Sequence, residues 1–411
     1  MRALILRASG ARSVKQAAKS VNMTTVPNTA TIDFETGALA DLKKTGIERQ
    51  TECPHFRVNC LGYSFDDAPA AVWTPGMPAP RELLAHIEAG GRVVAHNAPF
   101  EYQVWTNWLA PRTGWPRLTH KQLDCTMARA LALSLPGGLD KVCEAMRLPF
   151  TKDNRGRRAM LKYCKPLRLD PLEWCSDLDE WLALLTYCAH DVAAERALDR
   201  VLPRLSASEK EMWEVHERIN QRGVAVDVDC VNNALEFVQR EDARLSAEVR
   251  ALTGGKVTSA NQVAALIEWL AANGLETQKL RRADVASLLK SDVAQRDGTV
   301  RRLLELRKEG AKASVAKLQA MANRACADGR ARGTIQYHGA GTGRAAGRGI
   351  QTQNMVRPPG KFKDADAEYV MDALRLGYDL AAPLLIQRYG SVMQAISWAM
   401  RGFLVAGADN E

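Results

Sequence analysis

The sequence lacks several features that would assign it to other classes of protein. No Cys-x-x-Cys pair occurs among its nine cysteines, which disfavours a structural zinc site, and their scattered arrangement fits reduced thiols inside a cell. No stretch reaches the ~18 consecutive apolar residues of a membrane-spanning helix, so we expect no membrane partner. Internal repeats and low-complexity tracts are absent as well. These absences favour a globular, cytoplasmic protein.

Acidic residues are missing from one long segment and scarce in another. Residues 332–363 contain six basic residues and no Asp or Glu, and residues 152–168 contain seven basic residues and one acid. The whole chain carries a net charge of +9. Local excesses of positive charge are expected where a protein contacts phosphates, although each segment could also be a solvated basic face. The distribution therefore indicates a polyanionic partner.

Length and patterning predict two or three domains. The chain has 411 residues, of which 46% are hydrophobic, enough for more than one core. Residues 28–203 alternate strand-like and helix-like segments and predict a mixed α/β domain. Its strands are expected over residues 30–34, 57–64, 70–74 and 92–96, and its helices over 81–88, 100–109, 125–132, 138–146 and 181–199.

The remaining segments differ in pattern from this α/β domain. Residues 204–330 predict a helical domain, and residues 1–27 are basic and are expected to form a disordered tail. Helices in the second domain are expected over residues 209–220, 231–252, 263–272, 285–290 and 300–327.

Two short segments place carboxylates on common faces. Residues two apart on a strand share a face, so Asp33 and Glu35 in a predicted strand point the same way. Tyr187 and Asp191 are four apart in a predicted helix, so they are neighbours too. Each segment alone is common, and usually marks a solvated edge. Carboxylates that face each other from a strand and a helix can nevertheless hold two divalent cations for phosphodiester hydrolysis.

A third segment, residues 92–101, runs from an apolar strand into Asn97, Phe100 and Glu101. With it, the chain resembles the proofreading 3′–5′ exonuclease domain of family A DNA polymerases. That family carries Asp-x-Glu, Asn-x-x-(Phe/Tyr)-Asp and Tyr-x-x-x-Asp in this order. Glu101 stands where the family usually has Asp, which keeps the charge and adds one methylene group.

The resemblance implies a ribonuclease H-like fold, a mixed sheet flanked by helices, and a two-metal mechanism. The implied ligands of two Mg²⁺ or Mn²⁺ ions are Asp33, Glu35, Glu101 and Asp191. Tyr187 is expected to hold the attacking water, as in the tyrosine subclass of these exonucleases. Asn97 and Phe100 are expected to position the terminal nucleotide of a DNA 3′ end.

Two later segments extend the resemblance. Residues 256–262 resemble the tip of the family's thumb domain, with Lys256 where the family has Asn, although an ordinary helix cap would also explain them. Residues 337–354 resemble the Thr-Gly-Arg motif and the following Gln-Asn of phage-type members. The residues expected to contact duplex DNA are Thr258, Ser259, Gln262, Thr342, Gly343, Arg344, Arg348, Gln353 and Asn354.

The resemblance ends before the family's polymerase site. Neither palm aspartate is clearly present, and Asp409 is interpreted as part of the turn before the first of them. We therefore expect residues 331–411 to be the truncated start of a palm. The expected function is proofreading at DNA 3′ ends in a bacterial or phage-infected cell, with binding of the primer–template duplex. Polymerase activity is implied only by the family.

Three alternatives stay open. The chain could be a stand-alone exonuclease for repair or RNA trimming. It could be a catalytically inactive DNA-binding module, which Glu101 suggests. It could also be half of a split polymerase, completed by a separate palm–fingers polypeptide.

Overall fold

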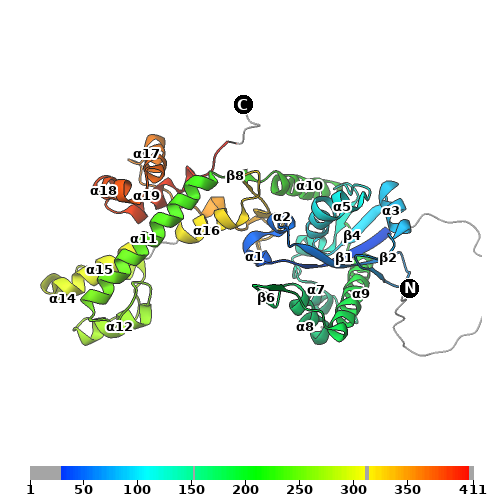
Figure 1. Cartoon of the computed structure of the whole chain (residues 1–411), viewed down its shortest axis with the longest axis horizontal. Helices are drawn as coiled ribbons and strands as arrows, with labels where there is room; N and C mark the ends of the chain where they lie inside the picture. Colours follow the sequence, from blue (N-terminus) through cyan, green and yellow to red (C-terminus); the bar gives the residue numbers. More distant parts are fainter. Residues whose placement is uncertain (1–28, 151–152, 311–313, 407–411) are drawn as a thin grey trace, which may run out of the picture. The chain divides into compact units, whose positions relative to one another are not determined.

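A computed structural model describes residues 29–150, 153–310 and 314–406, and these residues form two compact units. Unit 1 consists of residues up to Gly223 together with Arg332–Arg348, and unit 2 consists of Val224–Ala331 and the residues from Gly349 onward (Figure 1). The predicted tail over residues 1–27 and the interpreted turn at Asp409 lie outside the described residues. Within the described residues, no helix has the length and apolar character needed to cross a membrane.

Unit 1 is built on a five-stranded mixed sheet with the strand order β3-β2-β1-β4-β5. Strands β1, β2 and β3 are antiparallel neighbours, whereas β4 and β5 run parallel to β1. The strands are β1 (Thr29–Gly37), β2 (Arg57–Phe65), β3 (Ala71–Trp73), β4 (Arg92–Ala95) and β5 (Leu123–Cys125). The expected mixed sheet with flanking helices is therefore present.

Alternation along β1 separates an apolar face from a carboxylate face. Ile32 and Phe34 are buried in the main core of unit 1, where the Phe34 ring lies 6.3 Å from that of Trp105. Asp33 is paired with Gly62 of β2, and a Cβ built on Gly62 would lie 2.8 Å from Cys188 Sγ. Cys188 belongs to helix α9 (Leu178–Val201), so the missing side chain lets α9 pack closely against the carboxylate face.

The first four strands were predicted, and β5 was not. Helix α3 (Arg81–Glu88) has the predicted bounds, and the helix predicted over 100–109 begins earlier as α4 (Ala98–Gln103) and continues as a π-helix, η1 (Val104–Leu109). The other helices of unit 1 are α1 (Leu42–Thr45), α2 (Ile47–Thr51), α5 (Ala110–Thr113), α6 (Thr126–Ala132), α7 (Leu139–Ala145), α8 (Asn154–Tyr163) and α10 (Ala207–Arg222). Two small hairpins complete the unit: β6 (Arg168–Leu169) with β7 (Leu172–Glu173), and β10 (Ile335–Gln336) with β11 (Ala346–Gly347).

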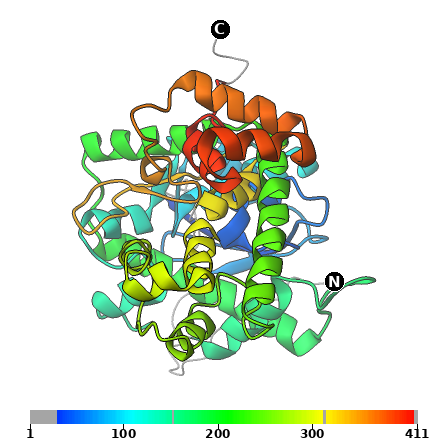
Figure 2. The same cartoon turned by 90° about the vertical axis from the view of Figure 1, so that its left-hand side faces the viewer.

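Unit 2 is organised along one long helix, α11 (Val228–Leu252), which contributes to two separate apolar cores. Its first half packs with the helices α16 to α19, and its second half packs with α12 to α15 (Figures 1 and 2). The other helices are α12 (Val263–Ala272), α13 (Arg282–Leu288), α14 (Asp292–Arg296), α15 (Gly298–Gly310), α16 (Ser314–Arg324), α17 (Asp364–Arg375), α18 (Tyr378–Tyr389) and α19 (Val392–Trp398). Short 3₁₀ turns, η2 (Thr352–Asn354) and η3 (Ala399–Arg401), and the strand pair β8 (Val224–Ala225) with β9 (Arg330–Ala331) complete it.

Some predicted boundaries differ from the observed elements. The helix predicted over 300–327 is described as α15 and α16, which lie on either side of residues 311–313. Helix α10, which we expected to open the second domain, belongs to compact unit 1. The compact units are defined by packing and not by function. It therefore stays a prediction that residues 28–203 form an exonuclease domain, 204–330 a thumb and 331–411 a palm.

Candidate active site

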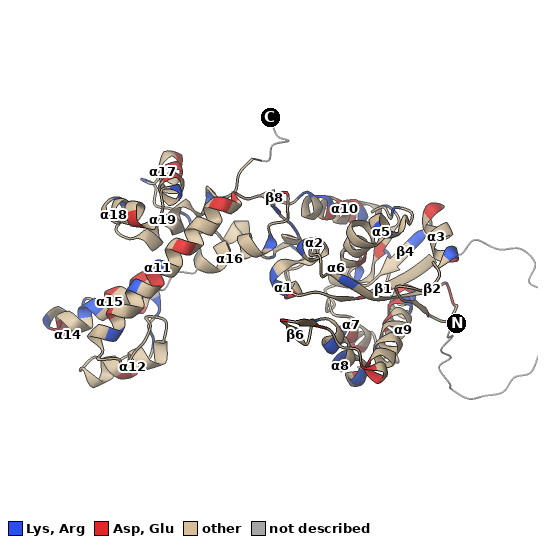
Figure 3. Ribbon diagram, in the orientation of Figure 1, with Lys and Arg blue, Asp and Glu red and all other residues tan. Residues whose placement is uncertain are grey.

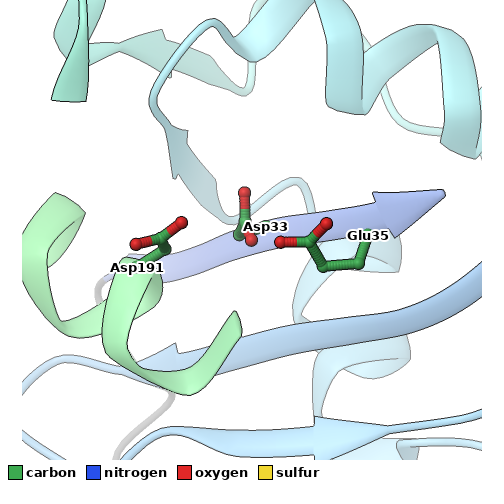
Figure 4. A group of neighbouring side chains, drawn as sticks. All are labelled: Asp33, Glu35 and Asp191. Carbon is green, nitrogen blue, oxygen red and sulfur yellow. The ribbon is translucent and has the colours of Figure 1, made fainter. Parts of the chain in front are cut away.

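Three carboxylates from β1 and α9 meet at the face of the sheet that α9 covers. Each of Asp33, Glu35 and Asp191 offers one carboxylate oxygen, and these oxygens all lie within 4.8 Å of one another. Figure 4 shows Asp33 and Glu35 on the strand, with Asp191 facing them from the helix. Within the described residues, this is the only group of three or more acidic, histidine or cysteine side chains with such geometry. Hard oxygen donors at this spacing fit Mg²⁺ or Mn²⁺.

Burial makes all three carboxylates harder to ionise, and the charge of Asp33 adds to this effect at Glu35 and Asp191. Burial raises the pKa of Asp33 to about 6, and a hydrogen bond from the Cys188 thiol acts against this shift. Burial, followed by the charge of Asp33, raises the pKa of Asp191 to about 8 and that of Glu35 well above its usual range. A bound cation would offset this repulsion, so the donor set is suited to a positive charge.

Tyr187 lies one turn before Asp191 on α9, as expected, and its hydroxyl stabilises the ionised form of the Asp191 carboxylate. Burial, followed by the charge of Asp191, raises the pKa of Tyr187 above its usual value, so the hydroxyl keeps its proton at neutral pH. Gly156 of α8 faces this ring: a Cβ at position 156 would lie 2.5 Å from Tyr187 Cδ2. Nothing in the sequence distinguished Gly156 from other glycines, because the contact depends on how two separate helices pack against each other.

Glu101 lies beside Asp33 but outside the group of three. It is 2% exposed, and the backbone N–H of Phe34 stabilises its charged form. The pairing of β1 with β4 extends from Thr29 to Thr31 and stops there. The β1 backbone beyond Thr31 is therefore open to the Glu101 side chain. Burial, followed by the charge of Asp33, raises the pKa of Glu101 well above its usual range.

Glu195 is an acid near the site that the sequence analysis missed. It lies four residues after Asp191 on α9 and is 1% exposed. Burial, followed by the charges of Asp33 and Glu101, raises the pKa of Glu195 well above its usual range, whereas the backbone N–H of His96 stabilises its ionised form. The i, i+4 relation to Asp191 was the available signal, but an acid on a helix is usually solvated.

Asn97 and Phe100 lie at the start of α4, next to Glu101. Asn97 has a left-handed backbone (φ 71°), and its carbonyl accepts a hydrogen bond from the Phe100 N–H at 2.8 Å. Phe100 is half-buried against the core of unit 1. This turn therefore sets the direction in which the chain leaves the end of β4 and enters α4, the helix that carries Glu101.

An ion-pair network fixes the end of α9 against the sheet. Arg92 donates to Asp124 Oδ2 and to Asp199 Oδ1, both at 2.6 Å. The buried guanidinium of Arg129 also binds Asp199 and donates to the Pro203 carbonyl at 3.0 Å. The network fixes the helix that carries Tyr187 and Asp191.

In unit 2, the predicted DNA-contacting residues Thr258, Ser259 and Gln262 form a turn before α12. The Thr258 N–H and hydroxyl both donate to Gln262 Oε1 at 3.0 Å. Ser259 Oγ accepts from the Asn261 N–H at 3.2 Å. Arg307 of α15 holds this turn by donating to the Ala260 carbonyl at 3.1 Å.

The Gly-rich motif is divided between the two units. Thr342, Gly343 and Arg344 are exposed in the loop of the β10–β11 hairpin, which belongs to unit 1, together with Arg348. Gln353 and Asn354 are exposed in the 3₁₀ turn η2 of unit 2.

Charges of both signs cover the long helices of unit 2. Figure 3 shows acidic and basic residues interspersed along α11. Many are paired: Arg244 binds Glu241 at 2.8 Å, and Arg302 of α15 binds Glu248 at 2.6 Å. The charges along these helices therefore largely neutralise one another.

Comparisons with known proteins identify one curated relative. No protein-family model matches the sequence. The chain is 34% identical over 397 residues to a DNA polymerase of Bacillus phage SP02, and the match covers 93% of this chain and 58% of that protein. Among solved structures, it is similar to the polymerase domain of Pol1 from M. smegmatis in complex with DNA primer–template and dNTP. That match has 15% identity and a TM-score of 0.45, and it covers 80% of this chain and 53% of that one.

Proposed function

Because this chain is related over nearly all of its length to a phage DNA polymerase and spans little more than half of that protein, we propose that it is the 3′–5′ exonuclease-bearing part of such a polymerase. Residues 28–203 would form a ribonuclease H-like exonuclease domain of the family A type, and the strand order β3-β2-β1-β4-β5 agrees with this proposal. The substrate would be the 3′ end of a DNA primer.

The observation that carries this proposal is the meeting of Asp33, Glu35 and Asp191, whose ligand atoms lie within 4.8 Å of one another. The three acids come from two motifs far apart in the sequence, and they are brought together by the packing of α9 on the sheet. Repulsion between such acids lowers the stability of the folded state. A purely structural role would give no reason to keep them together.

The residues would divide the work of hydrolysis between them. Asp33, Glu35 and Asp191 would hold Mg²⁺ or Mn²⁺, with Glu101 beside Asp33; when bound, such ions supply Lewis acidity and lower the pKa of water. The neutral Tyr187 hydroxyl, anchored on Asp191, would orient the attacking water. Asn97 and Phe100 would position the terminal nucleotide, with the Phe100 ring available for stacking on a base.

Duplex binding would involve both units. The exposed loop with Thr342, Gly343 and Arg344 offers backbone amides and a guanidinium, which suit phosphates. In unit 2, the turn over residues 258–262 lies at the N-terminus of α12, where free amides favour phosphate oxygens. A separate palm–fingers polypeptide is proposed as a further partner for the polymerase activity.

A degradation assay tests the proposal. The purified chain should shorten a 5′-labelled single-stranded DNA and a mismatched primer in the presence of Mg²⁺, and Asp33→Ala should abolish the activity. RNA shortened faster than DNA would favour a trimming nuclease instead. Equal rates for Asp33→Ala and the unchanged chain would show that the site assignment is wrong, and primer extension with dNTPs would show that polymerase activity needs no further polypeptide.

A further inference from the structure

A short hairpin of unit 1 exposes several leucines. It consists of β6 and β7, in which Leu169 is paired with Leu172. Every residue from 167 to 173 is exposed, with exposed fractions of 61% for Leu167, 69% for Leu169 and 37% for Leu172. Figure 1 shows β6 at the edge of unit 1, apart from the five-stranded sheet. Apolar side chains clustered on a surface indicate a contact with another molecule.

The base of the hairpin is fixed beside the candidate active site. Gly37 lies two residues after Glu35 on β1, and a Cβ built on it would lie 2.9 Å from both Trp174 Cζ3 and the Tyr163 carbonyl oxygen. The Tyr163 hydroxyl donates to the Asp177 carbonyl at 2.8 Å, which joins the chain entering the hairpin to the chain leaving it. The hairpin also connects α8 to α9, the helix that covers the site acids. Its tip is therefore held at a set position relative to the carboxylates.

Helix α8, which precedes the hairpin, carries a positive charge. It has no acid and four basic residues: Arg155, Arg157, Arg158 and Lys162. Lys162 is paired with Glu180 at 2.5 Å, and the three arginines are exposed. Gly156 of the same helix packs on Tyr187, so this charge lies next to the site. The phosphates of a DNA strand that enters the site would therefore be attracted to α8.

The tip of the hairpin offers phosphates no such attraction. Arg168 is paired with Glu173 at 3.5 Å, and Asp170 in the turn adds a negative charge. The leucines of the tip therefore suit the apolar faces of bases rather than the phosphate backbone. Leu is one of the side chains that enter between base steps and unstack them.

A base-paired 3′ end must be opened before it can react at the candidate site. Glu35 is 9% exposed, and α9 covers the face of the sheet that carries the acids. A nucleotide has to leave the base stack before a buried site can act on it, and this step costs free energy. An element beside the site that stabilises the opened end would lower this cost.

We propose that the β6–β7 hairpin is a strand-separating wedge. The side chains of Leu167, Leu169 and Leu172 pack against the last base pair of a primer duplex while α8 holds phosphates, and the unpaired 3′ end enters the site. The inference rests on the proposed exonuclease function and adds the step by which a paired end becomes a substrate. Single-stranded DNA does not need this step.

The opening of a duplex end can be measured without hydrolysis. In EDTA, the unchanged chain should raise the emission of the fluorescent base aminopurine placed at the paired 3′ end of a primer duplex, because the base unstacks. A double variant with Leu169→Thr and Leu172→Thr, which keeps residues that favour strands, should shift this opening back by about tenfold, the equilibrium cost of one base-pair step. Its affinity for single-stranded DNA, measured by anisotropy, should stay unchanged, which also reports that the variant is folded.

Two further variants serve as controls. Leu169→Met together with Leu172→Met keeps apolar side chains that can enter a base step, so the opening should be retained. Leu133→Thr is the matched control, because Leu133 is 47% exposed at the end of α6 in the same unit but does not belong to the hairpin. It should open the duplex end as the unchanged chain does.

Equal emission from duplex bound to the unchanged chain and to the double variant would overturn the inference. So would a double variant that loses self-association instead of duplex opening, because the hairpin would then be a contact between copies of the chain. With Mg²⁺, the double variant should degrade a paired 3′ end about tenfold more slowly and single-stranded DNA at the same rate. If the leucines open the duplex end but the unchanged chain degrades no DNA, the proposed function fails while the wedge stands. If single-stranded DNA is degraded but opening does not depend on the leucines, the wedge fails while the proposed function stands.

Discussion

The Tyr187 hydroxyl stabilises the ionised Asp191 carboxylate, and burial keeps this hydroxyl protonated at neutral pH. Its removal should therefore affect the orientation of water without removing a ligand. We expect Tyr187→Phe to lower the exonuclease kcat on the order of 10²-fold. KM for DNA and the affinity for Mn²⁺ should stay unchanged. A loss of Mn²⁺ binding in Tyr187→Phe would contradict this role.

The raised pKa values of Asp33 and Asp191 predict how stability depends on pH. The folded protein holds these protons up to about pH 6 and about pH 8, whereas the unfolded chain loses them near pH 4. Each unit of difference corresponds to about 1.4 kcal/mol, and it acts against folding once the unfolded carboxylates have ionised. In EDTA, the unfolding temperature of unit 1 should therefore fall as the pH rises from 4 to 8.

Added Mg²⁺ should restore the lost stability at pH 8, because it binds the ionised carboxylates of the folded state. Asp33→Asn should flatten the pH dependence in EDTA and weaken the effect of Mg²⁺, as measured by calorimetry. Glu217→Gln, which changes a buried acid on α10 of the same unit, should keep the full response to Mg²⁺. An unfolding temperature in EDTA that rises from pH 4 to pH 8 would refute the prediction.

Helix packing sets the position of Tyr187, and Gly156 of α8 is the residue that allows it. A Cβ at position 156 would overlap Tyr187 Cδ2 at 2.5 Å and Asp153 Oδ2 at the same distance. Gly156→Ala should thus push α8 away from α9 and lower kcat by about tenfold or more. Gly138→Ala is the control, since nothing lies within 4 Å of its added Cβ. Equal rates for both variants would show that the packing does not position Tyr187.

The end of α9 depends on Asp199, which binds both Arg92 and the buried Arg129. Asp199→Asn leaves the buried guanidinium without full compensation, and we expect it to lower the free energy of unfolding by about 3–5 kcal/mol. The exposed pair of Arg240 and Asp379 in unit 2 is the comparison. Asp379→Asn should change stability by only about 0–1 kcal/mol in urea unfolding.

At the level of elements, the sequence predicted those parts that periodicity controls. Strands β1 and β2 and helices α3 and α9 have long, regular patterns. Strand β5 is three residues long and reads like the start of the next helix, so it was missed. The helices α17 to α19 were not predicted.

The candidate site was predictable to the extent that its acids lie in short motifs. Asp33, Glu35 and Asp191 do meet, as strand and helix periodicity implied. Glu195 and Gly156 could not be found in this way, because their importance depends on which elements pack together. A glutamate one turn beyond Asp191 looks solvated until the sheet is known to lie against that face of α9.

For the whole molecule, binding of DNA should depend on salt and on the exposed loop of the β10–β11 hairpin. Arg344→Ala should weaken duplex binding and reduce the slope of log affinity against log salt by about one, if this side chain contacts one phosphate. Arg49→Ala is the control, since Arg49 is exposed in the same unit but pairs with Glu52 at 3.2 Å. Fluorescence anisotropy with labelled duplex at several salt concentrations measures both quantities, and identical slopes for Arg344→Ala and Arg49→Ala would exclude the contact.

Unit 1 is made from two separated stretches of chain, and this has a consequence for the order of events during synthesis. Tyr337 of the later stretch is 4% exposed in the core of unit 1, and Asn220 binds the Ile335 N–H and carbonyl at 2.9 and 2.8 Å. A ribosome must therefore produce all of Val224–Ala331 before the first unit can close its core. A nascent chain halted after residue 223 should remain open to proteases at α10, whereas one that has released Arg348 should be protected there.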